Sequence, residues 1–251
     1  MSTIPSPWDN ATTANTTSIP TVADTTSTAT IIEARELDLC VAGDAIDLLT
    51  DLPPDFILGN SARLISATRD ADGVVELVTA VGYDDRAACT FPYISARSLP
   101  WAGRMIARVQ ALGAVNYLGG GICVQVGTGT AVSFAGWFNW ATNCSVWNNG
   151  SGEPFLTAIT QSQWVWEMIE FSGPLCLFYY SLSTSDTPPT EKGSDSSSQW
   201  VRAAYVQLVP AGTTGGQALD WVRGLYAATV VPASTASHTI RARYMRWVYT
   251  Y

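Results

Sequence analysis

The chain has little charge, almost no lysine and a single histidine. Only 14% of its 251 residues are charged, whereas an ordinary soluble domain carries about 25%. Lys192 is the only lysine, and 13 Lys and Arg residues stand against 21 Asp and Glu, which gives a net charge of -8. Neutralising many phosphates takes clustered cations, so this composition excludes an ordinary duplex-DNA or RNA binder. We expect any genome to be contacted sparsely.

Patterns for metal binding, secretion and membrane insertion are also missing. The five cysteines form no CxxC pair, and one histidine cannot complete a zinc site with them. No basic start followed by an apolar segment opens the chain, so we expect no signal peptide. No residue is charged between Arg108 and Glu153, but Asn, Gln, Gly and Thr interrupt every apolar run well short of the roughly 20 residues of a membrane-spanning helix. We therefore expect no membrane partner.

What the sequence does contain is a series of strand-like segments. From Thr30 onward, segments rich in Val, Ile, Tyr, Phe and Trp are separated by Gly, Pro, Ser and Asp clusters, which is typical of all-β domains. The predicted strands cover 31–41, 62–68, 74–82, 104–112, 121–126, 131–138, 163–171, 175–182, 200–209 and 239–250. Alternation in the last segment predicts one face with Ile240, Ala242, Tyr244 and Val248, and an opposite face with Arg241, Arg243, Met245, Trp247 and Tyr249.

Two connections have a helical pattern. Asp44 can cap a helix over 45–52 that Pro53 ends, and residues 218–225 repeat apolar side chains at helical spacing, with a strand as the alternative. The sequence thus predicts one sandwich domain over 31–251 with short helices in its connections. An extended arm over 1–30, rich in Thr and Ser and without Lys or Arg, precedes it. The polar loop 183–198 is expected to be exposed.

Acidic residues suggest two kinds of chemistry. Residues 31–100 hold 12 acids and 5 arginines, and hard cations such as Ca²⁺ bind clustered carboxylates. We favour solvated turns there, with calcium at a subunit interface as the alternative. Glu167 and Glu170 could form a glycosidase pair, but on a strand they would point to opposite faces. The candidate metal ligands are Asp70, Asp72, Asp84 and Asp85.

His238 is the only histidine, at the entrance to the last strand, and no G-x-S-x-G motif occurs in the chain. We interpret it as a surface or interface side chain and do not expect an enzyme. Arginines on the last strand could contact nucleic acid beside Trp247, although pairing with the acidic residues of 31–100 is the interpretation we favour. These arginines are Arg241, Arg243 and Arg246.

The ten tryptophans are the most unusual feature. Tryptophan can stack on sugars, as in lectin-like sandwiches, or lie in cores and subunit interfaces. We favour cores and interfaces because the scarcity of charge also indicates covered surface. The candidate assembly residues are Trp8, Trp101, Trp137 and Trp140, whereas the alternative places sugars on Trp137, Trp140 or Trp147.

Taken together, an uncharged-to-acidic arm, about eight strands, short helices and a strong final strand resemble the single jelly-roll coat proteins of small icosahedral RNA viruses. The resemblance covers about 31–251 and rests on strand count and order. It implies an eight-stranded jelly roll that self-assembles, alone or with sister coat proteins, into a shell enclosing the genome. It also implies synthesis in a host cytoplasm and location in the virion. We expect no cofactor, with structural calcium at subunit interfaces as the alternative. The alternative function is a carbohydrate-binding β-sandwich, or a phage decoration or tail adhesin module.

Overall fold

The structure is a computed structural model of the chain. It describes residues 34–53, 57–59, 64–79, 86–95, 102–113, 118–126, 133–140, 142–148, 152–172, 175–208, 220–229 and 236–250. The predicted arm over 1–30 and the candidates Trp8, Trp101, Asp84 and Asp85 lie outside these residues.

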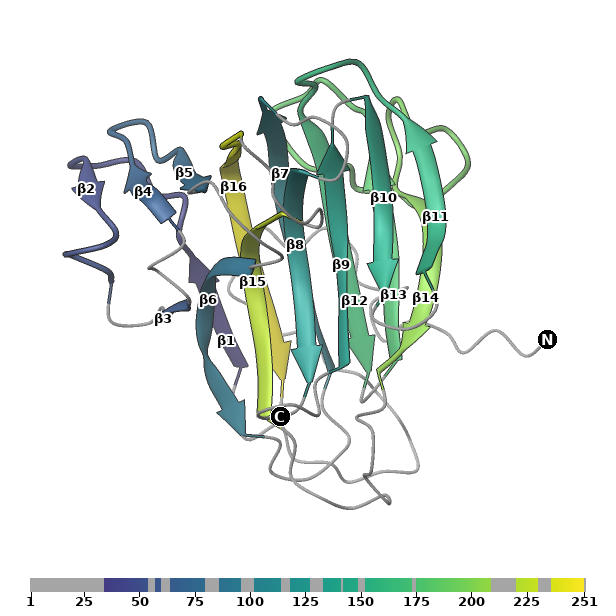
Figure 1. The fold of residues 1–251 in the computed structure, drawn as a ribbon. Helices are drawn as coiled ribbons and strands as arrows, with labels where there is room; N and C mark the ends of the chain where they lie inside the picture. Colours follow the sequence, from purple (N-terminus) through teal and green to yellow (C-terminus); the bar gives the residue numbers. More distant parts are fainter. Residues whose placement is uncertain are drawn as a thin grey trace.

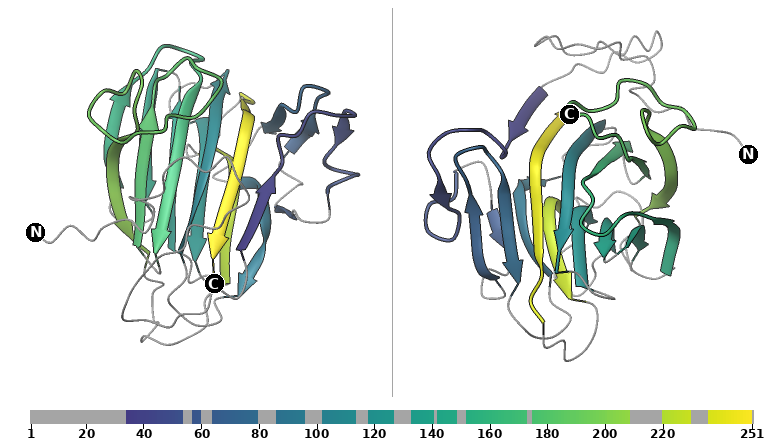
Figure 2. Two further views of the ribbon diagram at one scale, coloured as in Figure 1. Left: turned by 180° about the vertical axis from the view of Figure 1, so that it is seen from behind. Right: turned by 90° about the horizontal axis from the view of Figure 1, so that it is seen from above.

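The described residues form two antiparallel sheets packed face to face (Figures 1 and 2). Sheet A follows the order β14-β13-β12-β7-β16-β5-β4-β2, with β1 paired to β16, and sheet B follows β11-β10-β9-β8-β15-β6-β3. The chain crosses repeatedly between the sheets, so that the consecutive strands β15 and β16 lie in different layers. The strands of sheet A are β1 (Ala34–Asp38), β2 (Ile46–Asp47), β4 (Leu64–Arg69), β5 (Val75–Thr79), β7 (Ala102–Leu112), β12 (Val165–Ser172), β13 (Leu175–Ser181), β14 (Val201–Gln207) and β16 (Thr239–Thr250). Those of sheet B are β3 (Ile57–Gly59), β6 (Arg86–Ser95), β8 (Leu118–Val126), β9 (Ser133–Trp140), β10 (Asn143–Asn148), β11 (Gly152–Ala158) and β15 (Asp220–Thr229).

These sheets confirm the predicted all-β sandwich, and β16 has the bounds predicted for the last strand. The number of strands exceeds the predicted eight. Strands β6, β10 and β11 were not predicted, since small and polar residues interrupt their apolar pattern and their pairing with neighbours in sheet B defines them.

Both predicted helices are wrong. Residues 45–52 contain β2, which pairs with β4, and a single turn in which the Asp47 carbonyl accepts hydrogen bonds from the N–H groups of Thr50 and Asp51. Most of 218–225 lies in β15, which is hydrogen-bonded on both edges, to β8 and β6. Pairing with two neighbouring strands outweighs the helical spacing there. The described residues include no helix.

A bulge in β16 changes which side chains share a face. The register against β7 shifts between Ala242 and Tyr244, so β16 has one extra residue at Arg243. Beyond the bulge, Met245 is buried in the interior with Ala242, while Tyr244 packs outside, 5.2 Å from the ring of Trp166. The predicted faces of Tyr244 and Met245 are therefore wrong, because an inserted residue inverts the alternation.

Apolar side chains from both sheets fill the interior, with Trp137 among the largest that are fully buried. Its ring meets those of Phe155, Phe178 and Tyr180 edge-on, at centroid distances of 6.1, 5.9 and 6.1 Å. The prediction that Trp137 lies at an assembly interface is wrong, because its position on β9 directs it between the sheets. The same position excludes direct contact with a sugar.

A carboxyl group also lies in this interior. Glu167 on β12 is fully buried and accepts hydrogen bonds from the Ile122 N–H of β8, at 2.9 Å, and from the side-chain amide of Asn139 on β9. Glu170 lies on the other face of β12, where its carboxylate pairs with Lys192 Nζ at 2.9 Å. The two glutamates point apart, as predicted. Burial raises the pKa of Glu167 to about 8, against a smaller lowering by its hydrogen bonds.

Gly121 makes room for this carboxyl. A Cβ atom at this position would lie 2.7 Å from the Trp137 carbonyl oxygen and 2.8 Å from Glu167 Oε2. Only glycine allows β8 to approach both groups so closely.

His238 joins the sheets beside this carboxyl site, and the prediction that it lies at a surface or interface is wrong. Its ring is buried, with Nδ1 2.9 Å from the Thr79 hydroxyl and Nε2 3.0 Å from the Gly119 carbonyl oxygen. Burial lowers its pKa to about 4. The imidazole is therefore neutral near pH 7, and since a carbonyl can only accept, the proton lies on Nε2.

The turn between β4 and β5 is held by an aspartate and a glycine. Asp70 Oδ1 accepts hydrogen bonds from the N–H groups of Asp72 and Val74, at 3.0 and 2.8 Å. Gly73 has φ 81°, and a Cβ there would lie 2.8 Å from the backbone nitrogen of Ala42. Both the conformation and the space require glycine.

We predict that Gly73→Ala lowers the free energy of unfolding by about 1–3 kcal/mol, because a side chain meets both a left-handed backbone and fixed atoms. Gly43→Ala is the matched control, since a Cβ at Gly43 meets nothing within 4 Å. Urea unfolding of both variants measures the difference. Equal stability of the two variants would contradict the turn geometry.

We predict that stability falls as pH rises from 6.5 to 8, because the folded protein keeps the Glu167 proton that the unfolded chain releases above its ordinary pKa of 4.5. The slope for one proton is at most about 1.4 kcal/mol per pH unit. Below 6.5, the lowered pKa of His238 opposes this trend down to about pH 4, because the unfolded chain then binds a proton that the buried ring does not.

The variant Glu167→Gln should lose the fall between pH 6.5 and 8, while Glu170→Gln, on the same strand but the opposite face, should keep it. Chemical unfolding across this pH range tests both. An unchanged slope in Glu167→Gln would show that another group titrates.

Candidate functional site

The polar loop between β13 and β14 lies across the outer face of sheet A (Figure 2, left). We call residues 182–200 the strap. Most of its side chains are exposed, as predicted for 183–198. Beneath it is a second apolar cluster, separate from the interior, formed by Ile106, Trp166, Met168, Tyr179 and Trp200.

Two indole groups fasten the strap to the sheet. Trp166 Nε1 donates to the Ser185 carbonyl at 3.0 Å, and Trp200 Nε1 donates to the Pro189 carbonyl at 2.7 Å. The two rings also meet edge-on at 6.4 Å. Each tryptophan therefore supplies apolar contact below the strap and a hydrogen bond to its backbone.

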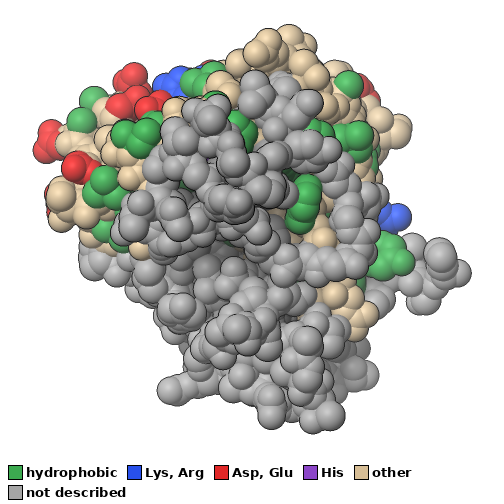
Figure 3. Space-filling view, viewed as in Figure 1, with side chains coloured by type: hydrophobic (Ala, Val, Ile, Leu, Met, Phe, Trp, Pro, Cys, Tyr) green, Lys and Arg blue, Asp and Glu red, His purple; other side chains and the backbone are tan. Residues whose placement is uncertain are grey.

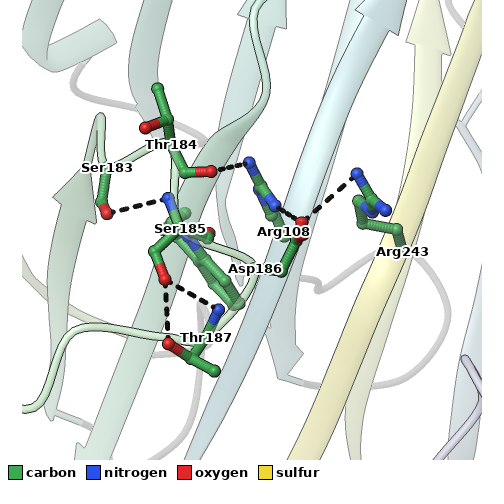
Figure 4. A network of polar contacts seen from close by, with 8 residues as sticks. Arg108, Ser183, Thr184, Ser185, Asp186, Thr187 and Arg243 are labelled. Atoms are coloured by element: carbon green, nitrogen blue, oxygen red, sulfur yellow. Dashed lines mark hydrogen bonds and ion pairs between the residues drawn. The ribbon is translucent and has the colours of Figure 1, made fainter.

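A nearly buried arginine provides the third attachment. Arg108 on β7 is 5% exposed, and its guanidinium donates to the Thr184 carbonyl at 2.9 Å and to the Asp186 carboxylate (Figure 4). Its Cζ lies 6.0 Å from the ring centroid of Trp164 and 5.6 Å from that of Trp166. A buried cation requires such fixed oxygens and rings around it.

Beside this attachment, arginines gather around one half-buried indole. Arg241 and Arg243 of β16 place Cζ 5.9 and 5.5 Å from the Trp164 centroid. Arg243 also pairs with Asp186 at 3.4 Å, an interaction drawn in Figure 4. We call this group of residues the Trp164 patch. It consists of Trp164, Arg108, Arg241, Arg243 and Asp186.

The structure brings together two of the three arginines that the sequence singled out. Arg241 pairs with Glu76 of β5 at 3.3 Å, which is the favoured pairing with residues 31–100, whereas Arg243 pairs with the strap. Arg246 lies near Arg104, whose pKa is lowered mainly by burial and further by the charge of Arg246. The side chain of Trp247 lies outside the described residues, so the predicted base-stacking arrangement stays a prediction.

The predicted metal ligands fall in a turn. Asp70 and Asp72 are exposed, and Asp70 uses Oδ1 to close the β4–β5 turn, as expected for a solvated turn. Within the described part of the chain, no group of three or more His, Cys, Asp or Glu residues could hold a metal ion. Figure 3 shows acidic side chains gathered at the edge that carries β2 and β4.

A second group of aromatic side chains lies on the outer face of sheet B. Phe138 lies 6.3 Å from Trp140 and 5.7 Å from Trp147, both half-buried, and Phe138 itself is 1% exposed. The predicted role of Trp140 in assembly stays a prediction. No helix among the described residues has the length and hydropathy that crossing a membrane requires.

Sequence reasoning missed Arg108 and Asp186 as site residues. Arg108 is one of two cations in β7 and is followed in the chain by 44 uncharged residues, and that isolation was the available signal. Asp186 carries no local signal, because a carboxylate in a polar loop is ordinary. Their meeting depends on how the strap folds back over sheet A.

No protein-family model matches the chain, and no curated protein matches it. Solved structures do match its fold. A GH43 protein from Bacillus licheniformis aligns with a TM-score of 0.51 and 11% identity over 80% of this chain and 38% of that chain. Lectin II from Ulex europaeus aligns with a TM-score of 0.48 and 8% identity over 88% of this chain and 99% of that chain. An alginate lyase from Corynebacterium sp. aligns with a TM-score of 0.43 and 11% identity over 85% of this chain and 90% of that chain. Identities this low bear on the fold alone. The chain is similar to them as a two-sheet β-sandwich.

Proposed function

We propose that this protein is a carbohydrate-binding β-sandwich that holds a saccharide at the Trp164 patch. The observation that carries the proposal is a half-buried indole with three guanidinium groups within 6.0 Å of its centroid, on one face of a sheet. Protein sites for sugars need an apolar surface for C–H groups and planar hydrogen-bond donors for hydroxyl groups. This patch supplies both kinds of contact.

The patch is also held in place before any ligand arrives. Arg108 is fixed by Thr184, Asp186 and two indole rings, and the strap is fastened by Trp166 and Trp200. Side chains that are already ordered lose little conformational entropy on binding, which favours recognition of a polar, flexible ligand. The other tryptophans with described side chains lie in the interior, under the strap or on sheet B.

The coat-protein hypothesis remains a prediction, since the arm on which subunit exchange would depend lies outside the described residues. Its corollaries also remain predictions, namely a large oligomer of self or sister proteins, a location in the virion and the absence of enzymatic activity. Light scattering tests it directly: a coat protein forms a particle of many copies, and a stable monomer at working concentration would contradict that hypothesis.

We predict that Trp164→Ala weakens saccharide binding about tenfold or more, because it removes the aromatic surface and the support of three arginines. A glycan array first identifies a bound saccharide, and calorimetric titration then compares the variants. Trp147→Ala is the matched control, a half-buried tryptophan on the outer face of sheet B, and it should bind like the unmodified protein.

Loss of binding in Trp147→Ala but not in Trp164→Ala would move the site to sheet B and overturn its assignment to sheet A. Failure of the unmodified protein to bind any glycan would overturn the proposed function. Thermal unfolding of each variant confirms that the fold is kept.

A further inference from the structure

The Trp164 patch holds more cations than the carboxylates that pair with them. Among the described residues, three guanidinium groups, from Arg108, Arg241 and Arg243, pair with two carboxylates, those of Asp186 and Glu76. The whole chain, by contrast, has a net charge of -8. A local excess of guanidinium groups on an acidic protein selects for an anionic ligand.

Asp186 occupies the position that a ligand anion would take. Its carboxylate contacts both Arg108 and Arg243, yet its side chain is 74% exposed. An ion pair with so exposed a partner contributes little to stability. Arg108, only 5% exposed, nevertheless requires an anionic oxygen beside it. Another carboxylate or a sulfate could meet that requirement as well as Asp186 does.

Moving Asp186 aside would not undo the strap. The attachments on either side of it are backbone carbonyls, those of Thr184, Ser185 and Pro189, which accept from Arg108, Trp166 and Trp200. Ser185 and Thr187 next to it are linked by their own hydroxyl groups at 2.9 Å (Figure 4). Rotation of the Asp186 side chain alone therefore clears the space between the two arginines.

We infer that the saccharide bound at the Trp164 patch is acidic, and that its carboxylate or sulfate group replaces Asp186 between Arg108 and Arg243. This inference rests on the proposed function. Trp164 supports the sugar ring and the arginines, and Asp186 acts as an internal competitor that keeps Arg108 neutralised while the site is empty. Asp186 is thus expected to weaken binding, although it lies in the site.

The test compares four probes by calorimetric titration at low salt. An oligogalacturonate carries carboxylates, dextran sulfate carries sulfates, neutral dextran carries no charge, and poly-L-glutamate is an anion without sugar rings. We expect one or both acidic saccharides to bind at least tenfold more tightly than dextran and poly-L-glutamate, and the comparison of the two distinguishes carboxylate from sulfate. Binding should weaken as salt is raised.

Two variants then test the competition. Asp186→Asn should bind the preferred acidic saccharide about two- to fivefold more tightly, the factor that corresponds to losing a weak exposed ion pair. Arg243→Ala should bind it about tenfold more weakly. Glu191→Gln removes the same charge from an exposed position of the strap and should change affinity less than twofold.

Weaker binding in Asp186→Asn would overturn the competition and make Asp186 a positioning residue. If dextran binds as tightly as the acidic probes, and Trp164→Ala abolishes that binding, this inference is overturned while the proposed function stands. Poly-L-glutamate bound as tightly as the acidic saccharides would show a general anion site and overturn the sugar-specific part. If no saccharide binds at all, the proposed function itself fails.

Discussion

A guanidinium group that is almost removed from water must be surrounded by fixed acceptors, and Arg108 imposes this requirement on the outer face of sheet A. No neighbouring strand provides the acceptors, so the strap does, through the Thr184 carbonyl and the Asp186 carboxylate. The rings of Trp164 and Trp166 pack against the remaining surface of the cation. A polar loop of ordinary composition is thereby fixed to the sheet, and the surface beside it becomes a defined site.

One extra residue in β16 determines which of its side chains joins the apolar cluster under the strap. Without the bulge at Arg243, regular alternation would place Tyr244 in the interior and Met245 outside. Arg241, Arg243 and Tyr244 lie on the outer side together. Arg241 and Arg243 are two residues apart and share the outer face by alternation alone, whereas the bulge adds Tyr244 to the cluster under the strap and keeps Met245 in the core.

Polar groups also connect the two sheets from within. From the side of sheet A, His238 donates a hydrogen bond to the Gly119 carbonyl of β8, and Glu167 accepts one from the Ile122 N–H of the same strand. Both titratable groups are held in their neutral form near pH 7, since ionisation without water is unfavourable. Hydrogen bonds of this kind are directional, unlike apolar contacts, so they fix how the two sheets are aligned.

The sequence by itself determined the all-β class, the bounds of β16, the solvated turn at Asp70 and the opposite directions of Glu167 and Glu170. Each of these follows from local spacing, because alternation and turn chemistry act over a few residues. Local spacing also predicted a helix at 218–225 and the faces beyond Ala242, and the structure contradicts both, with the strand alternative confirmed at 220–225. The surface position of His238, inferred from the lack of a catalytic motif, is contradicted as well. Strand pairing, a bulge and burial between sheets decided those features, and all three depend on residues far away in the chain. The Trp164 patch belongs to this second group: its members come from β7, β16, the strap and the residue just before β12, and only folding places them around one ring.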